Sequence, residues 1–425
     1  METFPATLRF PQVLALYIGS VLGSGILILP GLAAEAAGPA SLVAWGMMSL
    51  LVIPMALTMG LLSVRYPSAG GVSHFVTRAF GPGPGSLIGW LFLLSVVVGA
   101  PVLALTGAGY VCAAFGLGGP CRPAIAAVIL LAALVSNYLG MRTTGRLQVA
   151  VVVTTIVILA AALAGSVTAV DPGNFAPFLP HGWGSVGHAM TLIFWCFIGW
   201  EAVSHLTAEF EDPGRDVVRG TLAAAVVVSL VYLATAVAVI GTRSYGPGVS
   251  DVSLVHLIRL SSGAWGGYLS GAAALFICVA PAIAYTGAAS RLAYALSATG
   301  YAPTALSRLS RRYRTPAGGL GFLALAFGLV LLGFSSGLVS LPALIQLPNA
   351  SFILTYLGGC GAGLVLLRGV RAGRFVSAVS LALTGVILLF AGWSVLYPVL
   401  IALAWSAFML HRRRSGRPPL PEAEP

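Results

Sequence analysis

The chain has 425 residues, of which 58% are hydrophobic and only 8% are charged. Soluble domains carry about 25% charged residues, so this chain lacks the charges that would solvate a water-facing shell. The composition therefore predicts an integral membrane protein that has the lipid bilayer as a partner. The net charge of +11 would suit a nucleic-acid-binding protein. However, every basic residue is Arg and the arginines lie between apolar runs, so we expect no nucleic acid partner.

About twelve apolar stretches are long enough to cross a bilayer as helices, which takes about 20 residues each. They lie near residues 11–34, 40–64, 86–115, 123–140, 147–170, 185–208, 219–241, 268–290, 318–335, 339–367, 375–391 and 393–410. A barrel strand would show only about 10 residues of alternation, so these runs predict an all-α fold. The first run is too long for a signal peptide, and we expect it to be retained.

The stretches predict a single transmembrane domain over residues 1–410, followed by a cytoplasmic Arg- and Pro-rich tail over 411–425. The longest loops, near 242–267 and 291–317, are too short to fold alone. Within the first of them, segment 250–262 is typical of a short amphipathic helix on the outer face.

Arginine placement predicts the orientation, because cytoplasmic loops carry an excess of basic residues. With a cytoplasmic N-terminus, all of the 22 arginines except Arg122, Arg243 and Arg259 fall on the cytoplasmic side. We therefore expect both termini to face the cytoplasm, with the protein in the cytoplasmic (inner or plasma) membrane.

The five cysteines have no metal-ligand spacing, and we expect neither a metal site nor a cofactor. Cys112 and Cys121 could approach each other near one membrane face, but two unpaired thiols are the preferred interpretation.

The first span is interrupted by small residues and a proline. Gly19, Gly23, Ser24 and Gly25 lie in mid-membrane, and Pro30 lacks a backbone donor. A helix broken there would expose backbone groups, which are tolerated only where they line a cavity. The second half-helix would offer N–H groups and a positive dipole end to a carboxylate at Ser24 and Gly25. Equally, Gly19-x-x-x-Gly23 fits a helix-packing seam.

The sixth span contains Phe-Trp-Cys-Phe-Ile-Gly-Trp-Glu at 194–201. Gly199 marks a second weak point in a helix. Glu201 lies well inside the span, where an ionisable group is costly and suggests a function. The alternative is a structural carboxylate bonded to a neighbouring helix. His205 fits a polar capping residue better than a functional one.

The two interrupted spans, the first and the sixth, lie five spans apart. That spacing is the pattern of a five-plus-five inverted repeat. The repeats would cover about 11–170 and 185–367, with two extra C-terminal helices over 375–410.

Three stretches resemble the amino acid–polyamine–organocation (APC) transporter superfamily across nearly the whole chain. They are Gly-Ser-Gly-Ile at 23–26 with Pro30, the segment 197–201 running on to 209–216, and the segment 290–303 with Thr-Pro at 315–316. The resemblance implies the LeuT-like fold. The length and the compact motifs look most like a bacterial branch that exports methionine and branched-chain amino acids.

The resemblance also implies a binding site. The substrate carboxylate would be held by Ser24 and Gly25, and the ammonium by the carbonyls of Val21, Trp195 and Ile198. Trp195 would also close over the substrate as a gate, and Glu201 matches a position used in gating or proton sensing. The substrate-binding residues that we expect are Val21, Gly23, Ser24, Gly25, Trp195, Cys196 and Ile198.

Glu201 is the only Asp, Glu or Arg in a mid-span position, which favours a neutral apolar amino acid (Leu, Ile, Val or Met) over Arg or Glu. The coupling ion stays open between H⁺ and Na⁺. Proton coupling through a Lys of the fifth span is excluded, because the chain contains no Lys. A sodium site would need Thr286 and Ser290, although such hydroxyls usually bond their own helix backbone. Plain exchange without a coupling ion is a further alternative.

The sequence therefore predicts a secondary amino acid transporter that works by alternating access, with export one possible direction. An uptake permease or an exchanger for other amino acids or polyamines is the alternative. An intramembrane enzyme, with Ser24 as nucleophile and His188 or His205 as base, is a remote one. A channel would need a selectivity filter or a ring of charged residues, and the sequence shows neither. A sensor would normally add a soluble output domain, and the sequence shows none. The oligomeric state stays open.

Overall fold

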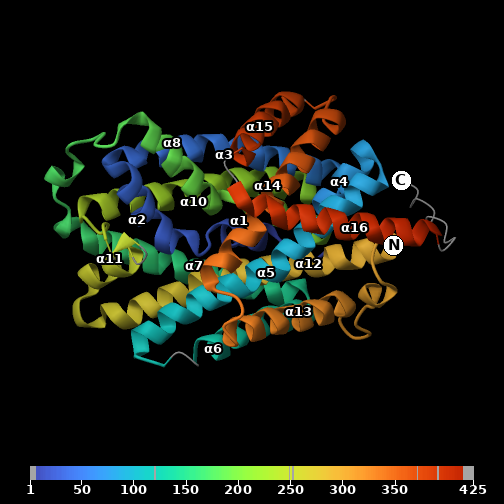
Figure 1. Ribbon diagram of the computed structural model, residues 1–425, viewed down its shortest axis with the longest axis horizontal. Coiled ribbons are helices and arrows are strands. Elements are labelled where there is room, and N and C mark those ends of the chain that lie inside the picture. Colours follow the sequence, from blue (N-terminus) through green and yellow to red (C-terminus); the bar gives the residue numbers. More distant parts are fainter. Residues whose placement is uncertain are drawn as a thin grey trace.

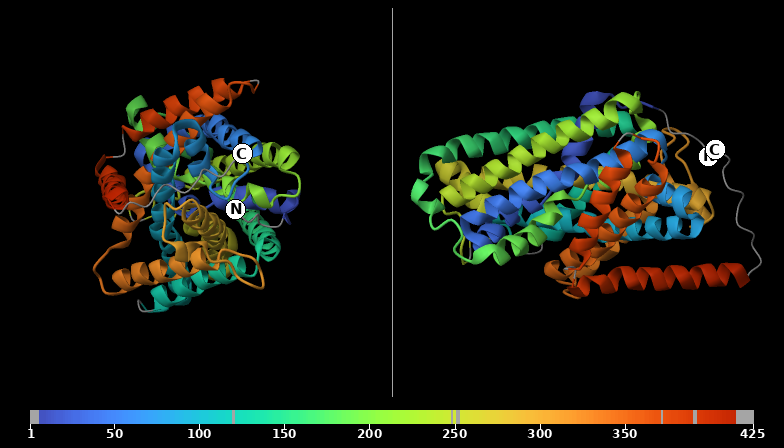
Figure 2. Two further views of the ribbon diagram at one scale, coloured as in Figure 1. Left: turned by 90° about the vertical axis from the view of Figure 1, so that its right-hand side faces the viewer. Right: turned by 90° about the horizontal axis from the view of Figure 1, so that it is seen from above.

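The computed structural model describes residues 6–118, 121–247, 249–250, 253–370, 372–389 and 392–414. Within these ranges the regular structure is helical, apart from one isolated bridge between Leu8 and Phe210. The long helices run side by side along the molecule (Figures 1 and 2). The α-helices are α1 (Phe10–Val21), α2 (Gly25–Ala37), α3 (Ser41–Arg65), α4 (Gly71–Phe80), α5 (Pro82–Phe115), α6 (Cys121–Tyr138), α7 (Met141–Ser166), α8 (Gly182–Ile193), α9 (Trp200–Ser204), α10 (Pro213–Gly241), α11 (Ser253–Ser262), α12 (Gly266–Ala298), α13 (Ala317–Ser335), α14 (Leu341–Leu366), α15 (Gly373–Leu388) and α16 (Leu396–Arg414).

In the described part of the chain, nine helical segments are long and apolar enough to cross a membrane. One of them, Gly25–Arg65, runs through α2 and α3, and another, Gly182–Ser204, runs from α8 through α9. Three shorter helices are also apolar: Phe10–Val21, Gly373–Leu388 and Leu396–Leu410. The prediction of an all-helical, membrane-spanning architecture is therefore confirmed.

Helix α12 lies at the centre of the bundle, and every residue from 280 to 297 is buried. Most of these residues are Ala, Gly or Ser, which let neighbouring backbones approach closely. At Gly287, for example, an added Cβ would lie 2.7 Å from Asn137 Oδ1 of α6. Helices α6 and α13, in contrast, expose large apolar side chains such as Leu131 and Leu329 outward. The protein thus has a small-residue centre and an apolar outer surface suited to lipid.

The first span is interrupted between α1, which ends at Val21, and α2, which begins at Gly25. The sixth is interrupted between α8 and α9, where a 3₁₀ turn covers Phe194–Phe197 and is followed by extended backbone. Gly199 then has φ 139°, a conformation that favours glycine. A Cβ at Gly199 would lie 2.6 Å from the carbonyl oxygen of Ser20 in α1. The two interruptions are therefore real, and their backbones touch.

A buried ion pair joins the end of the sixth span to α12. Arg291 is fully buried and binds the Glu209 carboxylate through Nε and Nη2. The Glu209 carbonyl in turn accepts hydrogen bonds from the backbone N–H groups of Thr7 (2.9 Å) and Leu8 (3.0 Å). The N-terminal segment, the segment after α9 and α12 are thereby fastened together.

Arg291 differs from the expectation in one respect. The predicted eighth span ends at 290 and leaves Arg291 in a loop, but α12 continues to Ala298 and buries it. The partner Glu209, far away in sequence, allows the charge to be buried, because ion pairing offsets the cost of desolvation. At the C-terminal end, α16 continues to Arg414, and residues 415–425 of the expected tail lie outside the described residues.

Two smaller expectations hold. The helix expected within 250–262 is α11, Ser253–Ser262, although residues 251–252 lie outside the described part. Cys112 and Cys121 are both free thiols, as preferred.

Removing one partner of the buried ion pair should destabilise the fold. In Arg291→Met the Glu209 carboxylate would be left buried without its counter-charge, at a cost of about 3–5 kcal/mol. Thermal unfolding of the detergent-purified protein would show this as a lowered midpoint. The control is Arg9→Met, which breaks the exposed Arg9–Glu211 pair and should cost no more than about 1 kcal/mol. Equal, small shifts in both variants would contradict the assigned importance of the buried pair.

Candidate functional site

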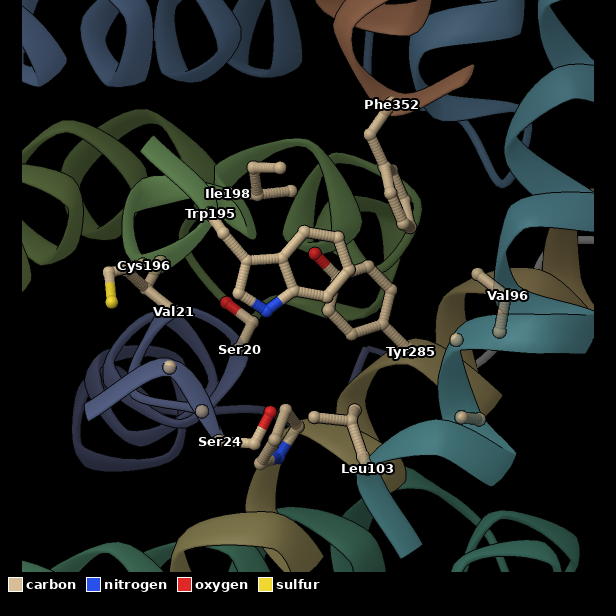
Figure 3. Close-up of a pocket in the computed structure, with 15 residues that line it drawn as sticks. Ser20, Val21, Ser24, Val96, Leu103, Trp195, Cys196, Ile198, Tyr285 and Phe352 are labelled. Atoms are coloured by element: carbon tan, nitrogen blue, oxygen red, sulfur yellow. The ribbon is translucent and has the colours of Figure 1, made fainter. Parts of the chain in front are cut away.

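A cavity of about 40 Å³ lies where the two interrupted spans meet (Figure 3). Helices α5, α12 and α14 close its other sides. Every residue that the sequence analysis expects to bind substrate lies on its wall: Val21, Gly23, Ser24, Gly25, Trp195, Cys196 and Ile198. The structure thus brings these residues together from two distant segments, while their roles in binding stay predictions. The rest of the wall is Ser20, Val96, Gly99, Ala100, Leu103, Pro281, Tyr285 and Phe352.

The α2 end of the cavity offers backbone N–H groups. Ser24 is the N-cap of α2, and its side chain makes no capping hydrogen bond. In this turn the N–H groups of Ile26 and Leu27 bond the carbonyls of Gly23 and Ser24. The N–H groups that precede them lie at the positive end of the helix dipole, which suits an anion. Gly25 is packed so closely that an added Cβ would lie 2.5 Å from Cys196 Sγ.

A tyrosine that the sequence analysis overlooked holds the two interruptions together. Tyr232 of α10 is fully buried, and its hydroxyl lies 2.9 Å from the carbonyl oxygens of both Val21 and Cys196. These carbonyls end α1 and the 3₁₀ turn, where helical donors run out. One hydroxyl proton therefore serves two helix ends. The available signal was a single aromatic residue, a tyrosine, within the apolar run 219–241.

Glu201 is fully buried, and neighbours hold both of its oxygens. Oε2 accepts a hydrogen bond from the Gly199 N–H (3.0 Å), and Oε1 accepts one from the Tyr285 hydroxyl (2.9 Å). The hydroxyl of Tyr356 accepts from the N–H groups of Gly199 (3.2 Å) and Trp200 (3.1 Å). The carboxylate is therefore bonded to a neighbouring helix, as one alternative foresaw. Tyr285 also lines the cavity, so the same contact links Glu201 to the site.

Trp195, the residue predicted to act as a gate, lies on the cavity wall. Its half-buried indole reaches across the cavity toward Tyr285 and Phe352 (Figure 3). The remaining volume of about 40 Å³ holds a few water molecules but not an amino acid. A substrate of that size can enter only if a wall side chain moves, and Trp195 is the large one that is not packed on all sides.

Thr286 and Ser290 do not lie on the cavity wall. Ser290 Oγ donates to the Gly287 carbonyl of its own helix (2.9 Å) and lies 3.3 Å from Arg291 Nη1. A sodium ion at Ser290 would therefore sit beside a guanidinium group. Thr286 Oγ1 is buried, and no hydrogen-bond partner is found for it among the described residues.

The histidines do not form a catalytic pair with Ser24. Neither His188 nor His205 lies on the cavity wall. His205 Nδ1 lies 3.2 Å from the Ala69 carbonyl, and its ring packs 4.6 Å from that of Phe92. No cluster of metal-ligating side chains occurs among the described residues.

The fold and the cavity fit the class of multi-pass membrane transporters, with a cavity between two interrupted helices. Comparison with known proteins identifies the family. The profile of the amino acid permease family matches residues 8–416, and the chain belongs to this family of the APC superfamily. The resemblance is confirmed, and the protein is a transporter rather than an enzyme.

Three bacterial relatives illustrate the family. The uncharacterized amino acid permease YecA of Bacillus subtilis is 36% identical, over 94% of each chain. The L-methionine/branched-chain amino acid exporter YjeH of Escherichia coli is 33% identical, over 98% of each chain. The branched-chain amino acid permease BcaP of Bacillus subtilis is 26% identical, over 70% of this chain and 68% of its own.

Removing the Tyr232 hydroxyl should loosen the contact between the interruptions. In Tyr232→Phe two buried carbonyls lose their donor, at a cost of about 1–3 kcal/mol. We expect faster alkylation of Cys196 by a small maleimide, read by peptide mass spectrometry. The control is Tyr397→Phe, which removes a hydroxyl–carbonyl bond of 3.0 Å to Leu94 away from the site. An unchanged Cys196 rate in Tyr232→Phe would rule out the clamping role.

Proposed function

We propose that the protein is a secondary transporter of neutral, apolar L-amino acids of the Leu, Ile, Val and Met class. It works by alternating access across the cytoplasmic membrane. The observation that carries the proposal is the cavity itself, because residues 21–25 and 195–198 meet there although the chain separates them widely. Export is the proposed direction, since the relative matched over 98% of both chains is named an exporter.

The proposed topology has twelve spans with both termini in the cytoplasm. Here α1 with α2 forms the first span and α8 with α9 the sixth, while α4 and α11 lie outside the count. The three shorter apolar helices complete the twelve. The two interruptions, five spans apart, support the inverted repeat of 11–170 and 185–367, with α15 and α16 as the extra helices.

In the proposed binding mode, Ser24 and the Gly25 N–H hold the substrate carboxylate. The carbonyls of Val21, Trp195 and Ile198 hold the ammonium group. Half-helix N-termini suit an anion and half-helix C-terminal ends suit a cation, which is the arrangement of discontinuous helices in transporters. A carbonyl oxygen has two lone pairs, so Val21 can accept from Tyr232 and from an ammonium group at once.

The contacts around the site bear on the coupling. The bond from Tyr285 to Glu201 supports a gating or proton-linked role for Glu201, because it joins a buried carboxylate to the cavity wall. The contact of Ser290 with Arg291 does not support a sodium site there. A polyamine substrate would need carboxylates facing the cavity, and both oxygens of Glu201 are engaged elsewhere.

Counterflow in proteoliposomes would test the function. Vesicles loaded with unlabelled leucine or methionine should transiently accumulate the labelled amino acid, whereas labelled arginine and glutamate should stay outside. Ser24→Ala should abolish or strongly reduce accumulation, because the carboxylate loses a hydroxyl donor. The matched control is Ser95→Ala, whose buried hydroxyl bonds only Leu91 of its own helix in the structure (2.7 Å) and lies off the wall. Full activity in folded Ser24→Ala would refute the assigned site.

Glu201 and Tyr285 should act as a pair in gating. We expect Glu201→Gln to change the rate of transport or its pH dependence more than the half-saturation concentration. Tyr285→Phe keeps the ring on the cavity wall but loses the hydroxyl, and it should shift the pH profile in the same way. Profiles of initial rate against pH for the wild type and both variants are the measurement. Three superimposable profiles would end the proton-linked interpretation.

A further inference from the structure

Two kinds of surface line the cavity. The interrupted helices supply backbone groups, whereas α5, α12 and α14 supply side chains. Two of these side chains reach the first interruption, because an added Cβ at Gly23 would lie 3.6 Å from Pro281 Cγ and 3.8 Å from Leu103 Cδ2. The Tyr285 hydroxyl is already bonded to Glu201, and Pro281 has no N–H. The wall formed by the three helices therefore suits the side chain of a substrate whose α-carboxylate and ammonium are held by the interrupted helices.

One face of α5 forms much of this apolar wall. Val96, Gly99, Ala100 and Leu103 line the cavity and follow the spacing of one helix face. Large side chains thus lie one turn before and one turn after a pair of small residues. On this face Gly99 contributes no side chain and lies opposite Phe352 of α14.

Gly99 differs from the glycine two turns further along α5. At Gly107 an added Cβ would lie 2.9 Å from Cys278 Cβ, so that glycine is needed for helix packing. At Gly99 an added Cβ would meet only Phe352 Cε2, at 4.0 Å, and otherwise open space. Gly in a helix interior is less stable than Ala. Helix packing gives no reason for glycine at 99, whereas room in the cavity does.

We propose that Gly99 sets the depth of the subsite for the substrate side chain. The hydrogen atom at this position leaves room between α5 and the Phe352 ring, and the side chain of a leucine- or methionine-sized substrate occupies it once Trp195 has moved. A methyl group at 99 shortens the subsite and leaves alanine as the preferred substrate. This inference rests on the proposed amino acid transport and identifies the residue that determines the size of the substrate.

Counterflow of labelled leucine, methionine and alanine would test the subsite in wild type, Gly99→Ala and Gly99→Val. One methylene in an apolar pocket changes discrimination by roughly 10- to 200-fold. The ratio of leucine to alanine transport should therefore fall by about that factor in Gly99→Ala and further in Gly99→Val. The matched control is Gly321→Ala on α13, where an added Cβ also meets open space but the cavity is absent. Its ratio should equal that of the wild type.

Alanine also stiffens α5, and a second variant separates that effect from the loss of room. Gly99→Ala combined with Phe352→Leu enlarges the opposite wall and should restore part of the leucine transport if the effect is steric. The subsite alone would be overturned if the wild type accumulates label while Gly99→Ala and Gly99→Val keep its ratio of leucine to alanine transport. Both variants must also unfold at the normal midpoint for this conclusion. Wild type that accumulates none of the three amino acids would overturn the proposed function, and the subsite with it.

Discussion

The architecture of the site depends on one buried hydroxyl group that lies between two helix ends. Helix α1 and the 3₁₀ turn after α8 both stop inside the bundle, where their last carbonyls have no helical donor. Tyr232 supplies the donor for both, at 2.9 Å from Val21 O and from Cys196 O. The close approach of Gly199 to the Ser20 carbonyl brings the two ends near enough for one hydroxyl to reach both. The cavity exists because this contact allows two helices to be interrupted side by side.

The two buried carboxylates of the sixth-span region follow the same rule, in that each is bonded to a partner from a distant segment. Glu201 is held by Gly199 and by Tyr285 of α12, and Glu209 is held by Arg291 of α12. Both carboxylates of the sixth-span region therefore fasten on the central helix, one beside the cavity and one at the end of the span. A shift of α9 against α12 would strain both contacts together. The two contacts thus link the cavity physically to the N-terminal segment, which is hydrogen-bonded to the Glu209 carbonyl.

The contrast between the centre and the surface explains how the helices can pack without a hydrophobic drive. Apolar side chains gain little free energy when they move from lipid to a helix interface, because lipid tails are equally apolar. Close packing must therefore come from small residues and hydrogen bonds. Helix α12 is buried from 280 to 297 through Ala, Gly and Ser, whereas α6 and α13 keep Leu131 and Leu329 at the surface. Glycines therefore serve two purposes here. Gly287 permits close packing with Asn137, and Gly99 leaves space at the cavity.

The sequence by itself determined the membrane class, the helical architecture, the two interruptions and the family, because composition, run length and glycine-rich motifs are local properties. Segments 21–25 and 195–198 were recognised from their motifs, and the structure brings them to one cavity wall. The sequence could not reveal the clamp at Tyr232, the burial of Arg291 by Glu209 or the difference between Gly99 and Gly107. Each of these depends on which distant atom lies within a few ångströms. Only tertiary packing decides that, since a tyrosine, an arginine or a glycine in an apolar run looks the same whether or not a partner faces it.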